Sequence, residues 1–157
     1  MTISAVRRKR QGGSAMVEFA IGATILASVF TGTFEFGYLF YIYNNVETAV
    51  NNGAKYAALR VYEVNSTSAS TCFKTAVQNM VAYGDPSGAT TNSVAPGLTP
   101  SKVTVTATFA NSVPSQMTVA INSYAINAVV ATITLTNKPQ ATYPFIGRYA
   151  PGESCVQ

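Results

Sequence analysis

The stretch that decides the fold is Gln11-Gly12-Gly13-Ser14-Ala15-Met16-Val17-Glu18-Phe19, which leads into an apolar run that ends at Tyr43. No charged residue occurs from Phe19 to Phe34, and none occurs from Phe36 to Tyr43. Because a helix of about 20 apolar residues crosses the hydrocarbon core of a bilayer, this run is long enough to span a membrane with some tilt. Residues 14–43 are therefore expected to form a transmembrane helix.

The positive charges are concentrated before this run. Of the ten Lys and Arg residues, four lie within the first ten positions: Arg7, Arg8, Lys9 and Arg10. By the positive-inside rule, this cluster predicts a cytoplasmic N-terminus, one span, and a remainder outside the cytoplasm. From Ser14 onward the chain has six basic and six acidic residues, so this part has no net charge. Its basic residues do not form a cluster interspersed with aromatic residues, as a nucleic-acid-binding groove would require. Nucleic acid is therefore not an expected partner.

The composition argues against an enzyme. The chain has 157 residues, enough for one domain, and only 10% of them are charged, against roughly 25% in an average globular protein. It has no His, which excludes His-based triads, His general bases and His-ligated metals, and it has only six acidic side chains. We therefore expect no catalytic residues, no metal and no cofactor.

Two ordinary explanations of the N-terminal run are incomplete. A secretory signal peptide would have an apolar core of roughly 7–15 residues followed by a small-x-small cleavage site, and this run is longer and lacks such a site. A plain signal anchor accounts for the cations and the span. It leaves Glu18 and Glu35 unexplained, because a carboxylate in the membrane is costly and usually functional.

The N-terminal segment resembles a type IV prepilin: basic residues, Gly13, the small Ser14, then Glu18 and the aromatic Phe19 before the apolar run. The stretch Glu35-Phe36-Gly37-Tyr38 and the later Ala49, Ala54, Tyr56, Ala57, Ala58 and Arg60 are similar to TadE-like pseudopilins of tight-adherence (Tad) pilus systems. Val130-Ala131-Thr132-Ile133-Thr134-Leu135 and Tyr143-Pro144-Phe145 resemble that family's closing strand and its Tyr-Pro-Phe. The resemblance covers residues 12–62 and, with weaker motifs, 128–146.

The resemblance implies cleavage by the membrane-embedded prepilin peptidase between Gly13 and Ser14, on the cytoplasmic face of the bacterial inner membrane. Ser14 would become the first residue, and Glu18 the fifth, where pilins carry their glutamate. The chain has Glu18-Phe19 where processed major pilins of this system usually carry Glu-Tyr, which favours a pseudopilin or an unusual subunit. It has Thr24 where the family often has a Pro.

The sequence suggests different roles for the two carboxylates in the run, Glu18 and Glu35. Glu18 lies one helical turn from Ser14, and an amine at Ser14 or at the terminus of a neighbouring subunit would stabilise its charge. Pairing with a neighbour would set the axial register during assembly, with Phe19 beside it; alternatively, Glu18 only meets lipid headgroups. For Glu35, on the outer half of the span, an interfacial position and a packing contact are equally consistent with the sequence.

The two cysteines, Cys72 and Cys155, lie far apart and outside any metal-binding spacing. They are expected to form a disulfide outside the cytoplasm, and the alternative is a pair of buried thiols.

Beyond the span the pattern stays helical to Tyr62, and an apolar stripe recurs at intervals of three and four residues: Val46, Val50, Gly53, Ala57 and Val61. Small residues in the stripe allow another backbone to approach closely. One helix over residues 14–62 would be about 73 Å long. A polar run at residues 65–68 ends it, and a short helix is expected from Cys72 to Tyr83, capped by Thr71 and ended by Gly84.

Residues 84–100 read as a surface loop, and strands are expected at 103–109, at 117–121 and, most clearly, at 129–136. The predicted fold is thus α+β and pilin-like: a long N-terminal transmembrane helix packed under a small antiparallel sheet. Residues 1–13 would be the cytoplasmic leader, 14–43 the transmembrane half of the helix, and 44–157 the extracytoplasmic domain.

The expected function is structural, as a minor pseudopilin in assembly of a Tad-type pilus, with the prepilin peptidase and other pilin subunits as partners in a homo- or hetero-oligomer. Two alternatives remain open: a main filament subunit at the cell surface, and an unprocessed membrane-anchored binding module.

Overall fold

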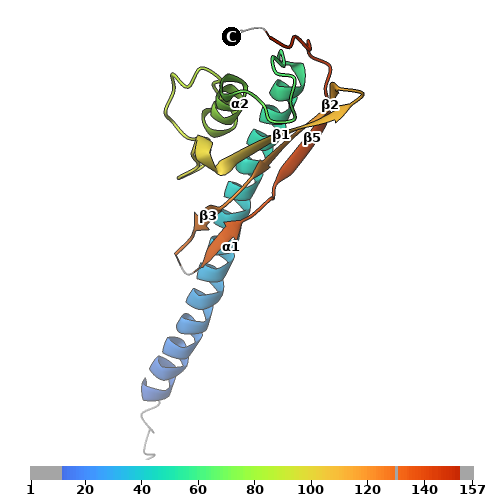
Figure 1. The fold of residues 1–157 in the computed structure, drawn as a ribbon. Helices are drawn as coiled ribbons and strands as arrows, with labels where there is room; N and C mark the ends of the chain where they lie inside the picture. The colour runs from blue at the N-terminus through green and yellow to red at the C-terminus, as the bar shows by residue number, and fades with distance from the viewer. Residues whose placement is uncertain (1–11, 130, 153–157) are drawn as a thin grey trace, which may run out of the picture. The chain divides into compact units, whose positions relative to one another are not determined.

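The computed structural model describes residues 12–129 and 131–152, and its packing divides the chain into two units, one ending at Gly37 and one beginning at Tyr38. The class is α+β, as predicted (Figure 1). The elements are α1 (Gly12–Leu59), α2 (Thr71–Tyr83), the short 3₁₀ helix η1 (Pro100–Lys102), β1 (Val103–Ala110), β2 (Val113–Ile121), β3 (Tyr124–Asn127), β4 (Thr132–Leu135) and β5 (Gln140–Pro144).

The long helix is confirmed, but its predicted end at Tyr62 is wrong, because α1 stops at Leu59. Tyr62 instead forms an isolated parallel bridge with Tyr149. The backbone N–H of Tyr62 donates to the carbonyl of Arg148 (2.9 Å), and the N–H of Gly147 donates to the carbonyl of Ala58 (2.9 Å). The chain after β5 thus pairs with the Ala58 carbonyl, which the helix end leaves free, and with the Tyr62 N–H, and so competes with further helical turns.

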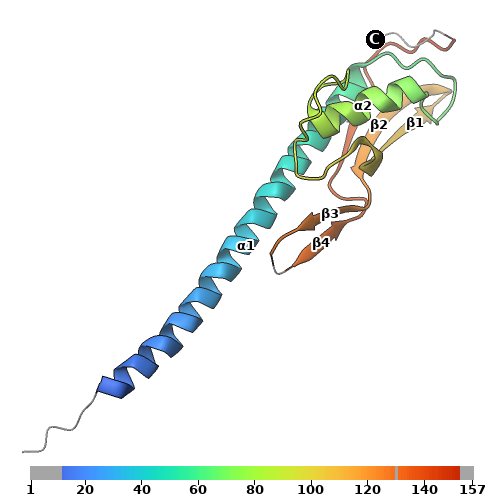
Figure 2. The same ribbon diagram turned by 90° about the vertical axis from the view of Figure 1, so that its left-hand side faces the viewer.

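Within the second unit, the apolar stripe of α1 is buried as expected. Val46, Val50 and Ala57 are buried in the core together with residues of α2 and the sheet. A Cβ atom at Gly53 would overlap Cγ2 of the buried Val81, which belongs to α2. The close approach that the small residues allow is therefore made by the second helix of the same chain (Figure 2).

The second helix forms almost where the sequence places it, but its predicted cap is wrong. Thr71 is the first helical residue, and the cap is Ser70, whose hydroxyl accepts from the backbone N–H of Phe73 at 3.1 Å. Gly84 ends the helix in a left-handed conformation (φ 72°), with its N–H donating to the carbonyl of Met80 at 3.0 Å.

Residues 84–100 carry no strand and no helix before η1, as expected of a loop, but the loop is not confined to the surface. Ala95 and Leu98 are fully buried in the core. The hydroxyl of Tyr124 donates to the carbonyl of Pro96 at 2.8 Å, which ties this part of the loop to β3.

The main sheet has the order β1-β2-β5 and is antiparallel. The alternation predicted for β1 is confirmed: Val103, Val105 and Ala107 are buried, and the threonines between them are exposed. The strand predicted at 117–121 begins earlier, at Val113. A tight turn at Asn111 and Ser112, both with positive φ (51° and 63°), pairs Ala110 with Val113 and extends the ladder.

The strand expected at 129–136 is wrong in extent and in burial. β4 covers only Thr132–Leu135 and pairs with β3 in a separate two-stranded sheet, while Val129 is 94% exposed and Ile133 45% exposed. The third position of the main sheet belongs to β5, which the sequence analysis did not identify as a strand. Pro144 closes β5 at the edge of the sheet, where a missing N–H is tolerated.

The Gly53–Val81 approach can be tested by Gly53→Ala. The added methyl must displace a β-branched side chain in a packed core, which we expect to lower the free energy of unfolding by about 1–3 kcal/mol, less the gain in helix propensity. Thermal unfolding of the reconstituted protein measures the change.

The matched control is Gly37→Ala, also within α1, where a Cβ atom meets nothing within 4 Å. It should leave the unfolding temperature unchanged or raise it. Equal unfolding temperatures for Gly53→Ala and the control would contradict this account of the helix packing.

Candidate functional site

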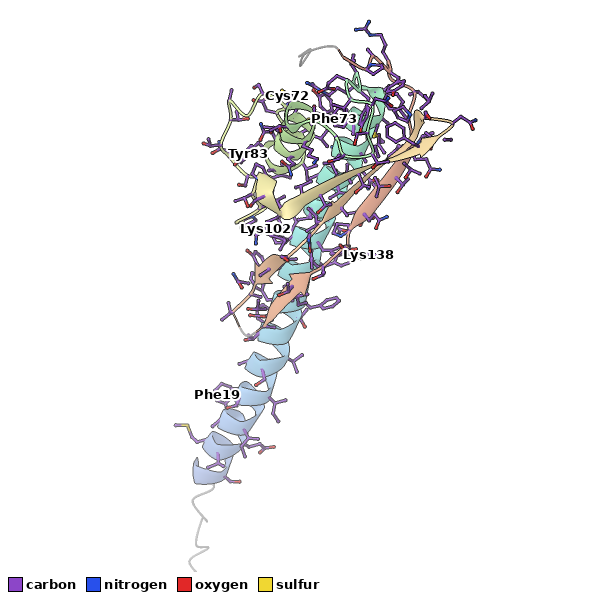
Figure 3. The ribbon with its side chains drawn as sticks, in the orientation of Figure 1. Phe19, Cys72, Phe73, Tyr83, Lys102 and Lys138 are labelled. Atoms are coloured by element: carbon purple, nitrogen blue, oxygen red, sulfur yellow. The ribbon has the colours of Figure 1, made fainter. Side chains whose placement is uncertain are left out.

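The N-terminal part of α1 presents its side chains outward on every face. All residues from Gly13 to Phe34 are exposed, including Phe19 (76%) and Phe34 (73%). Figure 3 shows Phe19 pointing away from the helix axis. An apolar helix exposed on all sides is unfavourable in water and needs lipid or other helices around it. The helix from Gly13 is also long and apolar enough to cross a membrane.

The expected cleavage site lies at the start of this helix. Gly13 and Ser14 are exposed, and no atom lies within 4 Å of a Cβ built at Gly13. Both lie in the first turn, whose backbone N–H groups have no partner within the helix, so the peptide between them is held only weakly. The cationic residues 7–10 before the site lie outside the described residues.

Glu18 and Phe19 follow on the same exposed helix. Glu18 stands four residues after Ser14, and side chains at this spacing share one helix face. Among the described residues no group donates a hydrogen bond to the Glu18 carboxylate or pairs with it. The structure therefore brings Gly13, Ser14, Glu18 and Phe19 together within two turns, and leaves the Glu18 carboxylate available to a partner outside the described chain.

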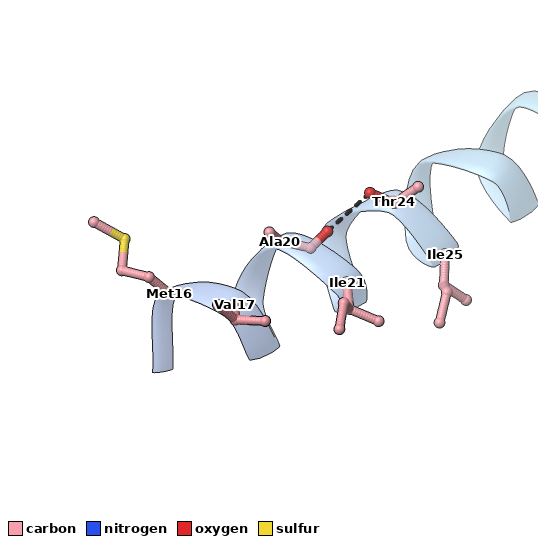
Figure 4. Close-up of a pocket in the computed structure, with 6 residues that line it drawn as sticks. All are labelled: Met16, Val17, Ala20, Ile21, Thr24 and Ile25. Atoms are coloured by element: carbon pink, nitrogen blue, oxygen red, sulfur yellow. Dashed lines mark hydrogen bonds between the residues drawn. The ribbon is translucent and has the colours of Figure 1, made fainter. Parts of the chain in front are cut away.

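Three hydroxyl groups in this segment are satisfied within the helix. Thr24 donates to the carbonyl of Ala20 (2.8 Å), Ser28 to that of Thr24 (2.8 Å) and Thr33 to that of Val29 (2.9 Å). Such back-bonding removes polar donors from the helix surface, as an apolar environment requires. Figure 4 shows the shallow hollow around the first of these bonds, lined by one face of a single helix and by no ionisable group.

The remaining expected site residues lie elsewhere. Glu35 lies near the end of the first unit, is half-buried, and interacts with other groups of the structure. Cys72 is half-buried in the first turn of α2. Cys155 lies outside the described residues, so the Cys72–Cys155 disulfide stays a prediction.

One polar cluster within the second unit was missed by the sequence analysis. Glu63 is buried and accepts a hydrogen bond from the Ser70 hydroxyl, while the Tyr62 hydroxyl donates to the carbonyl of Ser66 at 2.5 Å. Burial, with smaller effects of Glu63 and Tyr149, raises the pKa of Tyr62 to about 12. These bonds tie the segment after α1 to the cap of α2, which indicates a structural role.

The tyrosines at the start of the second unit were also missed. Tyr38, Tyr41 and Tyr43 fall within six positions of α1, at the outer end of the expected span. Tyrosine is enriched where membrane proteins cross the boundary between lipid and water, because its ring is apolar and its hydroxyl is polar. The spacing was available in the sequence as a signal for this boundary.

The N-terminal part of the chain matches a known protein family. Residues 13–55 match the model of the family of TadE-like proteins, and the searches of curated proteins and of solved structures found no match. The matched range begins at Gly13, includes Glu18, Phe19 and Glu35, and ends within the packed part of α1. It does not extend to 128–146, where the weaker resemblance stays a prediction. The resemblance to TadE-like proteins, a pilus-associated structural family, is thus confirmed for residues 13–55.

Proposed function

We propose that this chain is a minor pilin-like subunit that acts structurally in the assembly of a Tad-type pilus. The observation that carries the proposal is the N-terminal part of α1, which is apolar, exposed on every face and matched to TadE-like proteins. The chain does not cover this surface with its own described residues, so lipid before assembly and neighbouring helices afterwards are its natural environment. A catalytic role has no support in the ionisable residues.

Processing is the first step of the proposed function. The prepilin peptidase cleaves between Gly13 and Ser14 at the cytoplasmic face of the bacterial inner membrane, which removes the basic leader and frees the Ser14 amine. The exposure of both residues and the absence of a side chain on Gly13 support access by a protease. Residues 14–37 extend about 36 Å as a helix, which is sufficient for a hydrocarbon core of roughly 30 Å.

Assembly is the second step. In the mature subunit, Glu18 pairs with the N-terminal amine of a neighbouring subunit, with Phe19 packed beside it, and this pair fixes the axial register of the two helices. A carboxylate in an apolar environment is stabilised by such a partner and is costly without one. The domain from Tyr38 onward stays on the outer side of the membrane.

Cleavage is tested by Gly13→Phe. A bulky side chain at the junction should block access, so intact mass of the membrane-extracted protein should show the full-length chain, while the wild type loses residues 1–13. Gly12→Ala is the neighbouring control and should be processed normally. A wild-type mature protein whose N-terminus precedes Gly13 would overturn the prepilin reading and favour an unprocessed membrane-anchored module.

The role of Glu18 is tested by Glu18→Ala, scored separately for leader cleavage, membrane level and co-purification with pilus components. We expect normal cleavage and an unchanged or higher membrane level, because removing a carboxylate makes insertion easier. Co-purification should fall about tenfold, which corresponds to a lost pairing free energy of about 1.4 kcal/mol.

Glu47→Ala is the control, because Glu47 is an exposed carboxylate on the same helix within the second unit. Normal assembly of the Glu18 variant would show that Glu18 only meets headgroups. A high abundance of the wild-type chain in sheared filaments would instead indicate a main subunit.

A further inference from the structure

The two-stranded sheet of β3 and β4 forms a hairpin that exposes apolar side chains at its tip and on β4, while the face opposite its buried residues carries Asn127, Thr132 and Thr134. Val129, at the tip, is 94% exposed, and Ile133 on β4 is 45% exposed. The sequence contains no charged residue between Lys102 and Lys138, the two labelled lysines in Figure 3. Exposed sheet edges in soluble proteins are commonly protected by charged residues or proline, and the described strands of this hairpin have neither.

The inner side of the hairpin is packed on the start of the second unit. Tyr124 and Ile126 of β3 share one buried cluster with Ile42 and Val46 of α1, and Leu39 packs against that cluster. Burial raises the pKa of Tyr124, with a smaller contribution from the nearby Tyr38. The hairpin is therefore fixed against the part of α1 that contains Tyr38 and Ile42.

The hairpin points toward the end of the unit at which α1 enters it. Both ribbon views show β3 and β4 beside α1, with the end of β3 and the start of β4 lying toward that end (Figures 1 and 2). Tyr38, Tyr41 and Tyr43 mark this part of α1 as the boundary between lipid and water, and Phe40 and Tyr41 are exposed there (59% and 62%). The apolar tip thus lies toward the end of the unit at which α1 presents exposed apolar residues.

We propose that the β3–β4 hairpin is a second membrane contact, in which Val129 and Ile133 enter the headgroup layer of the outer leaflet beside α1. The inference rests on the proposed anchoring of α1 in the membrane and adds a surface to it. Because the hairpin carries no charge, the contact depends on apolar burial and not on anionic lipids. The contact stays in the headgroup layer, since the unpaired backbone groups along the hairpin edges cannot enter hydrocarbon.

The contact would also give the exposed tip of the hairpin a role in orienting the domain. A membrane contact close to α1 would limit rotation and tilt of the domain about the helix, and so orient it for incoming subunits. Such an effect needs only a weak contact, because the helix already holds the domain at the surface.

The test uses the absence of tryptophan from the chain, which makes any introduced Trp the only indole. Three variants of the full chain are reconstituted in phosphatidylcholine nanodiscs: Val129→Trp as the probe, Val113→Trp in β2 as a control, and Phe30→Trp within α1. Val113 is also an exposed apolar residue (46%), directly after the turn of the β1–β2 hairpin, so it matches the probe in chemistry. Fluorescence is measured with lipids brominated near the headgroup or near the chain ends, and with aqueous acrylamide.

We expect headgroup-proximal bromines to quench Val129→Trp at least twofold more than Val113→Trp, and mixing in anionic phosphatidylglycerol to leave this ratio unchanged. Phe30→Trp should be quenched most by bromines near the chain ends. Full acrylamide access and no lipid quenching at Val129→Trp would overturn the proposal while Phe30→Trp still reports an inserted helix. Shielding that grows with the protein-to-lipid ratio would also overturn it, because another copy would then cover the hairpin. A Phe30→Trp probe without lipid quenching would overturn both the anchoring and the inference.

Discussion

The structure depends on the close approach of α2 to the small-residue face of α1. Gly53 leaves no side chain where Val81 packs, and Ala54, Ala57 and Ala58 keep the same face narrow. This approach forms a core around a single helix, and the sheet and the long loop then add their apolar residues to it. Larger side chains on this face would separate the helices and leave the sheet without a buried partner.

The burial of α1 changes along its length, and the change occurs near Tyr38. Up to Phe34 no described residue is buried, whereas from Ile42 onward every turn contributes to the core. One half of α1 is thus part of a folded domain, and the other half is the part for which we propose contact with lipid and neighbouring subunits. This division explains why an apolar helical segment that no described residue covers is compatible with a stable protein. It also explains why the motif residues Gly13, Ser14 and Glu18 contribute nothing to the core.

The sequence predicted those parts of the fold in which one periodicity governs a long segment. α1, α2 and the alternation of β1 follow this rule. β5 is short and ends at Pro144, so no pattern indicated it, and its pairing with β2 depends on tertiary contacts. The alternation at 129–136 suggested a core strand, yet β4 is mostly exposed, because alternation indicates two unlike faces and does not say what covers them. The cleavage and register roles of Gly13, Ser14, Glu18 and Phe19 were inferred from the resemblance to type IV prepilins and stay predictions, because they depend on partners that one sequence does not contain.

The central claim is that the domain from Tyr38 onward folds on its own, and that residues 14–37 are reserved for the membrane and for assembly. The most direct measurement is thermal unfolding of residues 38–157 in aqueous buffer without detergent or lipid, followed by circular dichroism and size-exclusion chromatography. The account predicts a soluble chain with cooperative unfolding, at a temperature close to that of the same domain in the reconstituted full-length protein. A chain without cooperative unfolding, or one that loses its helix and sheet signals once residues 1–37 are removed, would contradict it.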